Sequence, residues 1–268
     1  ALRHCIVGNK NYPEVFRDKA FKGKLYALED LVLNTQSLLQ QLSEPYSTSI
    51  YRDAPAVNTD NTGNVTGITL STGETITAER YIFAAGAGNA ALLNHAKLAD
   101  ITMQRRPLHQ VAAKGNLPSI YAHAVSIRSA SKPRLTLTTH PCLDGDNVWY
   151  LGGNLAETGV EKSGEEQIEI AKKEVRDLLP WVDITDLRWT SFHIDRAEPA
   201  QKTHARPDFP FVHRSENTLT CWPTKLTLTP MLAEQVSQAI SIVPSSSPPP
   251  KYNLPHATLG ISPWDNLF

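Results

Sequence analysis

The sequence predicts a mixed α/β fold that contains an antiparallel sheet, and three observations support this prediction. A buried-type strand over 81–85 runs straight into a Gly86-x-Gly88 turn and a helical segment, as in α/β nucleotide-binding units. Several strand candidates with short connecting loops follow between residues 110 and 151, and consecutive strands joined in this way pair antiparallel. Amphipathic helical patterns with stop signals flank both regions.

The first third of the chain is expected to hold one helix and a small meander. Leucine and valine residues at close to helical spacing predict a first helix over 28–42 with one face in the core, and Pro45 follows its end. Short β-rich runs over 49–51, 67–70 and 74–77 predict a hairpin or meander because turn sequences separate them.

Further strands are expected in the middle of the chain, and two helices after them. The strand candidates are 110–114, 121–127, 134–140 and 148–151. Apolar periodicity, basic residues in the last turn and a terminating Pro180 predict a second helix over 165–179. A third helix is expected over 230–242 with proline in its first turn, and the serine- and proline-rich segment 245–250 breaks the pattern.

Composition excludes several classes of protein. With 268 residues and 41% hydrophobic residues, the chain can build one large domain or two small ones. Its 26 Lys+Arg and 27 Asp+Glu give a net charge of -1, which disfavours a dedicated nucleic-acid binder. Cys5, Cys142 and Cys221 are too scattered for a disulfide framework or a zinc cluster, so we expect reduced thiols and no metal site. Without an apolar run of about 20 residues or a signal-peptide pattern, a cytoplasmic protein with no membrane span is expected.

The sharpest motif is Gly86-Ala87-Gly88-Asn89-Ala90-Ala91, placed after a strand and before a helix. Glycines at such a turn let backbone N–H groups approach a phosphate. A self-standing NAD site would also need an acid at the end of the next strand, but Arg105 and Arg106 occur there and no acid follows Asp100. The motif therefore favours a loop that contributes to a larger nucleotide site, and a tight turn that touches no ligand is the alternative.

Several segments extend this interpretation, and they occur in a fixed order. They are 75–93 with its Ala84-Ala85-Gly86, 104–110, 140–159 with its His140-Pro141 and Asp144-Gly145 pairs, 196–210, and 222–230. In these segments and in their order, the sequence over about 21–242 resembles the FAD-dependent amino-acid oxidases of the D-amino acid oxidase and glycine oxidase type.

This resemblance implies a fold and an activity. It implies a partial, Rossmann-like FAD-binding domain formed by 1–100 and 187–268, and an antiparallel-sheet substrate domain formed by 101–186. It also implies FAD as cofactor and an amine or amino-acid substrate oxidised by hydride transfer to the flavin. Because no Gly-x-Gly-x-x-Gly opening precedes Gly86, the chain is expected to lack the family's first, pyrophosphate-binding unit. In the closing loop, Pro223 and Lys225 replace glycines and an arginine of the family.

The same resemblance assigns two segments to the flavin. The first is Ala84, Ala85, Gly86 and Ala87; the second is Thr224, Lys225, Leu226 and Thr227. Lys225 could place positive charge near the flavin ring, and a solvated loop lysine is the alternative.

Three further residues are candidates for catalysis. Arg196 is the first choice for the anchor of a substrate carboxylate, because a guanidinium binds a carboxylate in bidentate fashion. An ordinary ion pair with Asp195 or Glu198 is the alternative role for Arg196. His109 and His140 lie on segments that the family points toward its active site, and a core or surface role is the alternative for each.

Two other functions stay open from the sequence. A cofactor-free binding or scaffold module that kept the fold would account for the absent opening and for Pro223 and Lys225. A nicotinamide-dependent dehydrogenase using the Gly86 turn would need an acidic ribose ligand, which the sequence does not offer.

Overall fold

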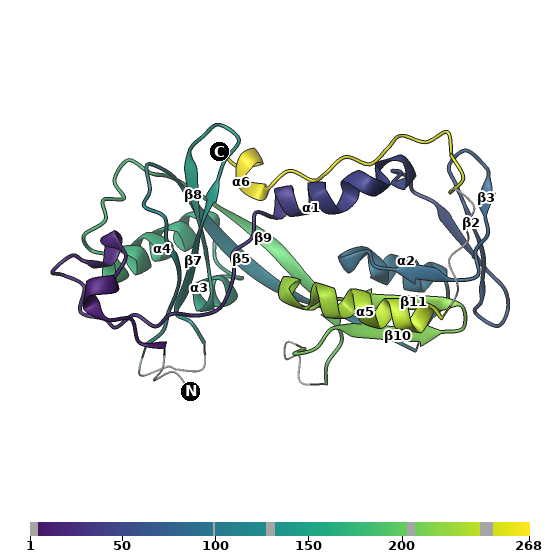
Figure 1. Cartoon of the computed structure of the whole chain (residues 1–268), viewed down its shortest axis with the longest axis horizontal. Helices are drawn as coiled ribbons and strands as arrows, with labels where there is room; N and C mark the ends of the chain where they lie inside the picture. Colours follow the sequence, from purple (N-terminus) through teal and green to yellow (C-terminus); the bar gives the residue numbers. More distant parts are fainter. Residues whose placement is uncertain (1–4, 99, 127–131, 203–206, 242–248) are drawn as a thin grey trace. The chain divides into compact units, whose positions relative to one another are not determined.

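A computed structural model describes residues 5–98, 100–126, 132–202, 207–241 and 249–268 (Figure 1). The chain divides into two compact units. Unit 1 comprises Ala1–Gln41, Pro107–Ile194 and Leu259–Phe268; unit 2 comprises Leu42–Arg106 and Asp195–Thr258.

Unit 1 is built on an antiparallel sheet. Its strands are β5 (Met103–Gly115), β6 (Tyr121–Ala124), β7 (Leu135–Pro141), β8 (Asn147–Gly152) and β9 (Arg188–Pro199), in the spatial order β6-β7-β8-β5-β9. The pairs β6/β7, β7/β8 and β5/β8 are antiparallel, which confirms the predicted pairing of the middle strands. The ends of β5 and β9, Met103–Arg106 and Asp195–Pro199, belong to unit 2.

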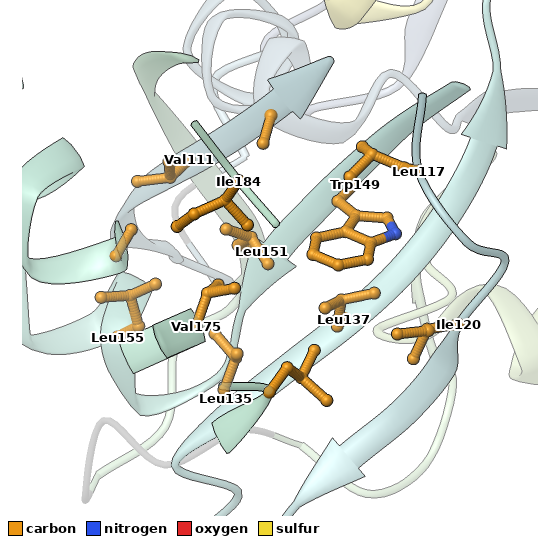
Figure 2. Packing of buried hydrophobic residues seen from close by; sticks show 13 residues of the cluster. Val111, Leu117, Ile120, Leu135, Leu137, Trp149, Leu151, Leu155, Val175 and Ile184 are labelled. Atoms are coloured by element: carbon orange, nitrogen blue, oxygen red, sulfur yellow. The ribbon is translucent and has the colours of Figure 1, made fainter. Parts of the chain in front are cut away.

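The core of unit 1 fills one face of this sheet. Val111, Leu137, Trp149 and Leu151 point from the strands toward the helical layer that includes Val175 (Figure 2). The helices are α3 (Asn154–Thr158) and α4 (Gly164–Leu178). Because side chains alternate across a strand, the residues between these apolar positions, such as Thr138 and His140, face the other side.

Helix α4 confirms the prediction for 165–179. The Ser163 side chain accepts a hydrogen bond from the backbone N–H of Glu166 over 3.2 Å, which satisfies one unpaired donor at the helix start. The helix ends two residues before Pro180, as expected for a residue that cannot continue it. Gln167, Ala171 and Val175 form its buried side.

Unit 2 contains two small sheets and two helices. The meander is β1 (Ala56–Thr59), β2 (Val65–Thr69) and β3 (Thr75–Ile76), and the second sheet has the order β10 (Phe211–Ser215), β11 (Thr218–Trp222) and β4 (Tyr81–Phe83). Its α-helices are α2 (Asn89–His95) and α5 (Thr229–Ile240), and α5 packs on β10 and β11. The second and third strands of the predicted meander, the strand before Gly86 and the third helix are therefore confirmed, whereas the first strand of the meander is 56–59.

Shorter helices complete the chain. They are α1 (Thr35–Ser43), α6 (Pro263–Asn266) and the 3₁₀ segments η2 (Asn9–Asn11), η3 (Glu14–Phe16), η4 (Glu44–Ser49), η5 (Gly86–Gly88) and η6 (Leu226–Leu228). Within the described residues, none of these or the longer helices has the length and apolar character needed to cross a membrane.

The prediction for the first helix is wrong in two respects. Residues 28–34 are not helical, and the helix begins at Thr35. The side-chain oxygen of Asn34 accepts the backbone N–H of Ser37 over 3.0 Å and caps the helix at this point. The expected core face is also absent from α1, which buries no residue, and Leu31 and Leu42 are 77% and 60% exposed. The strand expected over 49–51 is wrong too, since η4 occupies its start and Tyr51 makes only an isolated bridge to His256.

The unit boundaries differ from the expected domain boundaries of 1–100, 101–186 and 187–268. Residues 1–41 and 259–268 belong to the unit that holds the antiparallel sheet. Trp181 donates its indole N–H to the Val15 carbonyl over 2.5 Å, and Trp264 stacks on His140, so both terminal segments are attached to this unit. The serine- and proline-rich segment 245–250, expected to be neither helix nor strand, lies outside the described residues up to position 248. Its last two residues, Pro249 and Pro250, belong to no helix or strand.

Candidate cofactor site

Two parallel strands bring the predicted flavin segments to one sheet edge. Strand β4 pairs in parallel with β11, with Tyr81 opposite Thr218 and Phe83 opposite Thr220. Parallel neighbours end at the same edge of a sheet, and ligands of α/β sheets bind beyond the carboxyl ends of strands. The structure therefore brings together 84–87, which follow β4, and 224–227, which follow β11.

Side chains join the turn after β4 to the end of β11. The indole Nε1 of Trp222 donates a hydrogen bond to the Gly86 carbonyl over 3.0 Å. Asn89 is completely buried; its Oδ1 accepts the Ala85 N–H over 2.8 Å and its Nδ2 donates to the Cys221 carbonyl over 3.1 Å. Sequence reasoning did not single out Asn89 or Trp222, although Asn89 lies inside the Gly86 motif, because the contacts that link them across the sheet edge, Asn89 with Cys221 and Trp222 with Gly86, are distant in the chain.

The backbone of Gly86 adopts a left-handed conformation, which glycine tolerates better than other residues. Its φ is +58°, a left-handed conformation that glycine adopts without a steric cost. No atom among the described residues lies within 4 Å of the position that a Cβ would take there. Ala84, Ala85 and Ala87 are exposed around it, so this turn is open to a ligand.

The second segment is held in place by polar contacts. Thr224 has a φ of +61°, which is costly for a β-branched residue, and its hydroxyl donates to the Phe209 carbonyl over 3.1 Å. Lys225 is half-buried and its Nζ lies 3.4 Å from the carboxylate of the exposed Asp208. Leu226 and Thr227 are exposed. Such backbone strain is typical of ligand-binding segments.

Two ionisable groups lie near these strands. Burial raises the pKa of the Cys221 thiol in β11, so it stays protonated and is unsuited to nucleophilic chemistry. Asp100 accepts a hydrogen bond from His213 over 2.6 Å, and this contact lowers the pKa of its carboxyl.

Arg196 lies half-buried on β9 in unit 2. Both acids proposed as its alternative partners hold other arginines: Asp195 pairs with Arg105 over 3.2 Å, and Glu198 with Arg106 over 2.9 Å. The carboxylate-binding role of Arg196 stays a prediction.

His109 is buried in unit 1 and both of its ring nitrogens have protein partners. Nδ1 lies 2.9 Å from the Gly159 carbonyl and Nε2 lies 3.0 Å from the Ser191 hydroxyl. The ring also stacks on His193 with centroids 3.9 Å apart. This geometry favours a structural role, and its catalytic role stays a prediction.

His140 is half-buried in unit 1, on the sheet face opposite α4. Its Nε2 lies 2.8 Å from the Thr138 hydroxyl, and its ring stacks on Trp264 with centroids 4.5 Å apart. Burial lowers the pKa of His140, so the neutral imidazole predominates at neutral pH. It lines a groove of about 290 Å³. The described residues of the chain contain no cluster of three or more metal-ligating side chains.

Comparisons with known proteins were made over the whole chain. No family model matches it. It is 41% identical over 229 residues to the probable FAD-dependent oxidoreductase PA4991 of Pseudomonas aeruginosa strain PAO1, which covers 85% of this chain. The chain spans 58% of the length of that curated relative.

The structure was also compared with solved structures of other proteins, and PA4991 is again similar to this chain. The crystal structure of the FAD-dependent oxidoreductase PA4991 matches with a TM-score of 0.88 and 38% identity, over 97% of this chain and 72% of that chain. Iminodiacetate oxidase from Chelativorans sp. BNC1 matches with a TM-score of 0.45 and 16% identity, over 74% of this chain and 51% of its own. The second likeness is too low to carry an argument.

Proposed function

Because the chain belongs to the family of FAD-dependent oxidoreductases that includes PA4991, we propose that it binds FAD at the β4/β11 edge and takes part in oxidising an amine or amino acid. The observation that carries the proposal is the parallel pairing of these strands, since it sets Gly86 and Lys225 at one edge. The amine or amino-acid class rests on the sequence resemblance together with Arg196.

The residues at this edge fit a flavin nucleotide. The Gly86 turn leaves the space of a side chain open, so a ligand can approach its backbone. Lys225 supplies a positive charge, which is suited to a flavin that gains negative charge on reduction. Trp222 and Asn89 fix the spacing between the two segments through their hydrogen bonds.

Bound FAD would supply the hydride acceptor, while the protein positions the substrate. We infer that Arg196 binds the carboxylate of an amino-acid substrate through its planar guanidinium.

FAD binding is tested with a matched pair of glycine variants. FAD is titrated into the purified chain, and binding is followed by flavin fluorescence and by the flavin absorption bands. Gly86→Ala puts a methyl group into the space left for the ligand, and we expect at least a tenfold weaker affinity. Gly73→Ala is the control: Gly73 also has a positive φ, +91°, with no described atom within 4 Å, but it lies in the β2–β3 turn.

The outcomes separate the two functions that the sequence left open. Weaker FAD binding in Gly86→Ala alone supports the proposal, whereas equal weakening in both variants assigns the effect to backbone strain. Absence of flavin binding by the chain would contradict the proposal and favour the cofactor-free binding module, which Pro223 and Lys225 in the closing loop already allow.

The substrate class needs a separate experiment. Amino acids and the amines that result from their decarboxylation are offered to the flavin-loaded protein, and flavin bleaching under anaerobic conditions reports reduction. Arg196→Leu should abolish reduction by the amino acids and spare reduction by the amines. Arg214→Leu, which removes an exposed arginine from β10, serves as the control. Equal reduction by amino acids in wild type and Arg196→Leu would exclude the anchor.

A further inference from the structure

A groove of about 290 Å³ is lined by residues of unit 1, whereas β4 and β11 belong to unit 2. Its walls come from the first turns of α1, the end of β7 and the segment that includes α6. The residues that carry the argument are Gln36, Gln40, His140, Ser262, Trp264 and Asp265. Its volume lies just below the range of drug-sized sites, about 300–1,000 Å³, and suits a small ligand.

Most polar groups in this groove can both donate and accept hydrogen bonds. Gln36 and Gln40 are four residues apart in α1, so their carboxamides lie on one face of the helix. Each carboxamide offers N–H donors and a carbonyl acceptor, and the Ser262 hydroxyl offers both functions on one oxygen. Such groups match the hydroxyl groups of a ligand, which also donate and accept.

The lining carries little charge. Among the described lining residues there is no lysine or arginine, and Asp265 is the single carboxylate. One oxygen of Asp265 accepts the backbone N–H of Leu143 over 2.8 Å. Burial raises the pKa of the Cys142 thiol, which therefore stays neutral. An anionic ligand would find no counter-charge in this groove.

His140 adds a neutral group with mixed hydrogen-bonding capacity. Its Nε2 is occupied by Thr138, whereas Nδ1 has no partner within the part of the chain that the structure describes. Because burial lowers the pKa of His140, the ring is neutral at neutral pH and one nitrogen donates while the other accepts. The stacked Trp264 supplies an apolar aromatic wall beside these polar groups.

We propose that this groove binds a neutral, polyhydroxylated small molecule of the sugar or polyol class. Such a molecule presents hydroxyl groups to the carboxamides, serine and imidazole, and C–H groups to the indole. The proposal is independent of FAD binding, because every residue that carries it belongs to unit 1.

The experiment follows the indole N–H signals of the full chain by ¹H–¹⁵N NMR. The chain has 5 tryptophans, and the signal of Trp264 is assigned by its loss in Trp264→Phe. D-Fructose, D-glucose and myo-inositol are the neutral probes, and D-gluconate and D-glucosamine are the anionic and cationic ones. At least one neutral probe should shift the Trp264 signal saturably, with a dissociation constant on the order of millimolar.

Two neighbouring glutamines provide the matched variants. Gln40→Leu removes a carboxamide that lines the groove, and we expect affinity to fall at least fivefold. Gln41→Leu removes an exposed carboxamide from the same helix outside the lining, and affinity should stay unchanged. Because α1 buries no residue, both variants should fold, and the other indole signals verify this in each sample.

Three results would overturn the proposal. The first is the absence of a saturable shift with all neutral probes. The second is tighter binding of gluconate or glucosamine than of their neutral counterpart, which would indicate a site for a charged ligand. The third is an equal loss of affinity in Gln40→Leu and Gln41→Leu, which would place the probe outside this groove.

Discussion

The indole Nε1 of Trp222 and the carbonyl oxygen of Gly86 are joined by a 3.0 Å hydrogen bond that ties the end of β11 to the turn after β4. Trp222→Phe keeps an aromatic ring but removes the donor. A hydrogen bond of this kind contributes about 1 kcal/mol, so if it positions the turn for FAD, affinity should fall about fivefold. Fluorescence titration with FAD measures the change.

Trp149→Phe is the control for this prediction. Trp149 is also buried, and its indole N–H donates to the Pro118 carbonyl over 2.9 Å, but it belongs to unit 1. Both variants should lose comparable stability, while FAD affinity should change only in Trp222→Phe. An unchanged FAD affinity in Trp222→Phe would show that this hydrogen bond does not position the turn.

Asn89 should be important for the stability of unit 2. Asn89→Ala removes the acceptor of the Ala85 N–H and the donor to the Cys221 carbonyl, which should lower the free energy of unfolding by about 2–4 kcal/mol. Asn94→Ala changes an exposed asparagine on the same helix and should cost less than about 1 kcal/mol. Urea unfolding of both variants makes the comparison, and similar midpoints would contradict the role given to Asn89.

Two ion pairs between β5 and β9 should differ in strength because they differ in burial. Glu198 is buried and accepts two hydrogen bonds from Arg106, so Glu198→Gln should destabilise the protein by about 3–5 kcal/mol. Asp195 and Arg105 are largely exposed, so Asp195→Asn should cost less than about 1 kcal/mol. Thermal and urea unfolding of the two variants test the difference. A similar cost for both would mean that burial does not set the strength of these pairs.

The lowered pKa of His140 predicts a pH dependence of stability. Because burial lowers the pKa of His140 in the folded state below its ordinary value of about 6.5, the unfolded chain takes up the proton first as pH falls. This group therefore lowers stability progressively from about pH 6.5 downward, until the folded state is protonated too. His140→Gln should make the fall in free energy of unfolding between about pH 6.5 and 5 less steep. Parallel curves for the two proteins would contradict the assignment.

Local signals in the sequence predicted the parts of the fold that local interactions decide. Helix α4 has apolar periodicity and a terminating Pro180, and the Gly86 turn has the residue type that a φ of +58° favours. The helix predicted over 28–42 shows the limit of such signals. Leucine spacing continues upstream of Asn34, but the cap at Asn34 decides where the helix begins, and α1 buries none of its residues.

The remaining features depend on partners far apart in the sequence. Strand β9 was missed because its polar and charged residues show no clean alternation, and its pairing depends on β5. The two predicted flavin segments were named from the family resemblance, yet their meeting depends on the pairing of β4 with β11. The burial of Asn89 depends on the Cys221 carbonyl, which no pattern around Asn89 announces.

The parallel pair β4/β11 also has a consequence for synthesis on the ribosome. Gly86 and Trp222 are 136 positions apart, so at about 5–20 residues per second β4 emerges about 7–27 s before its neighbour. The strands β5 to β8 are made within that interval and can pair with one another while β4 still lacks β11. During this delay the nascent chain exposes an apolar edge that attracts other chains. Chaperone binding to this edge should therefore raise the yield of folded unit 2 more than that of unit 1.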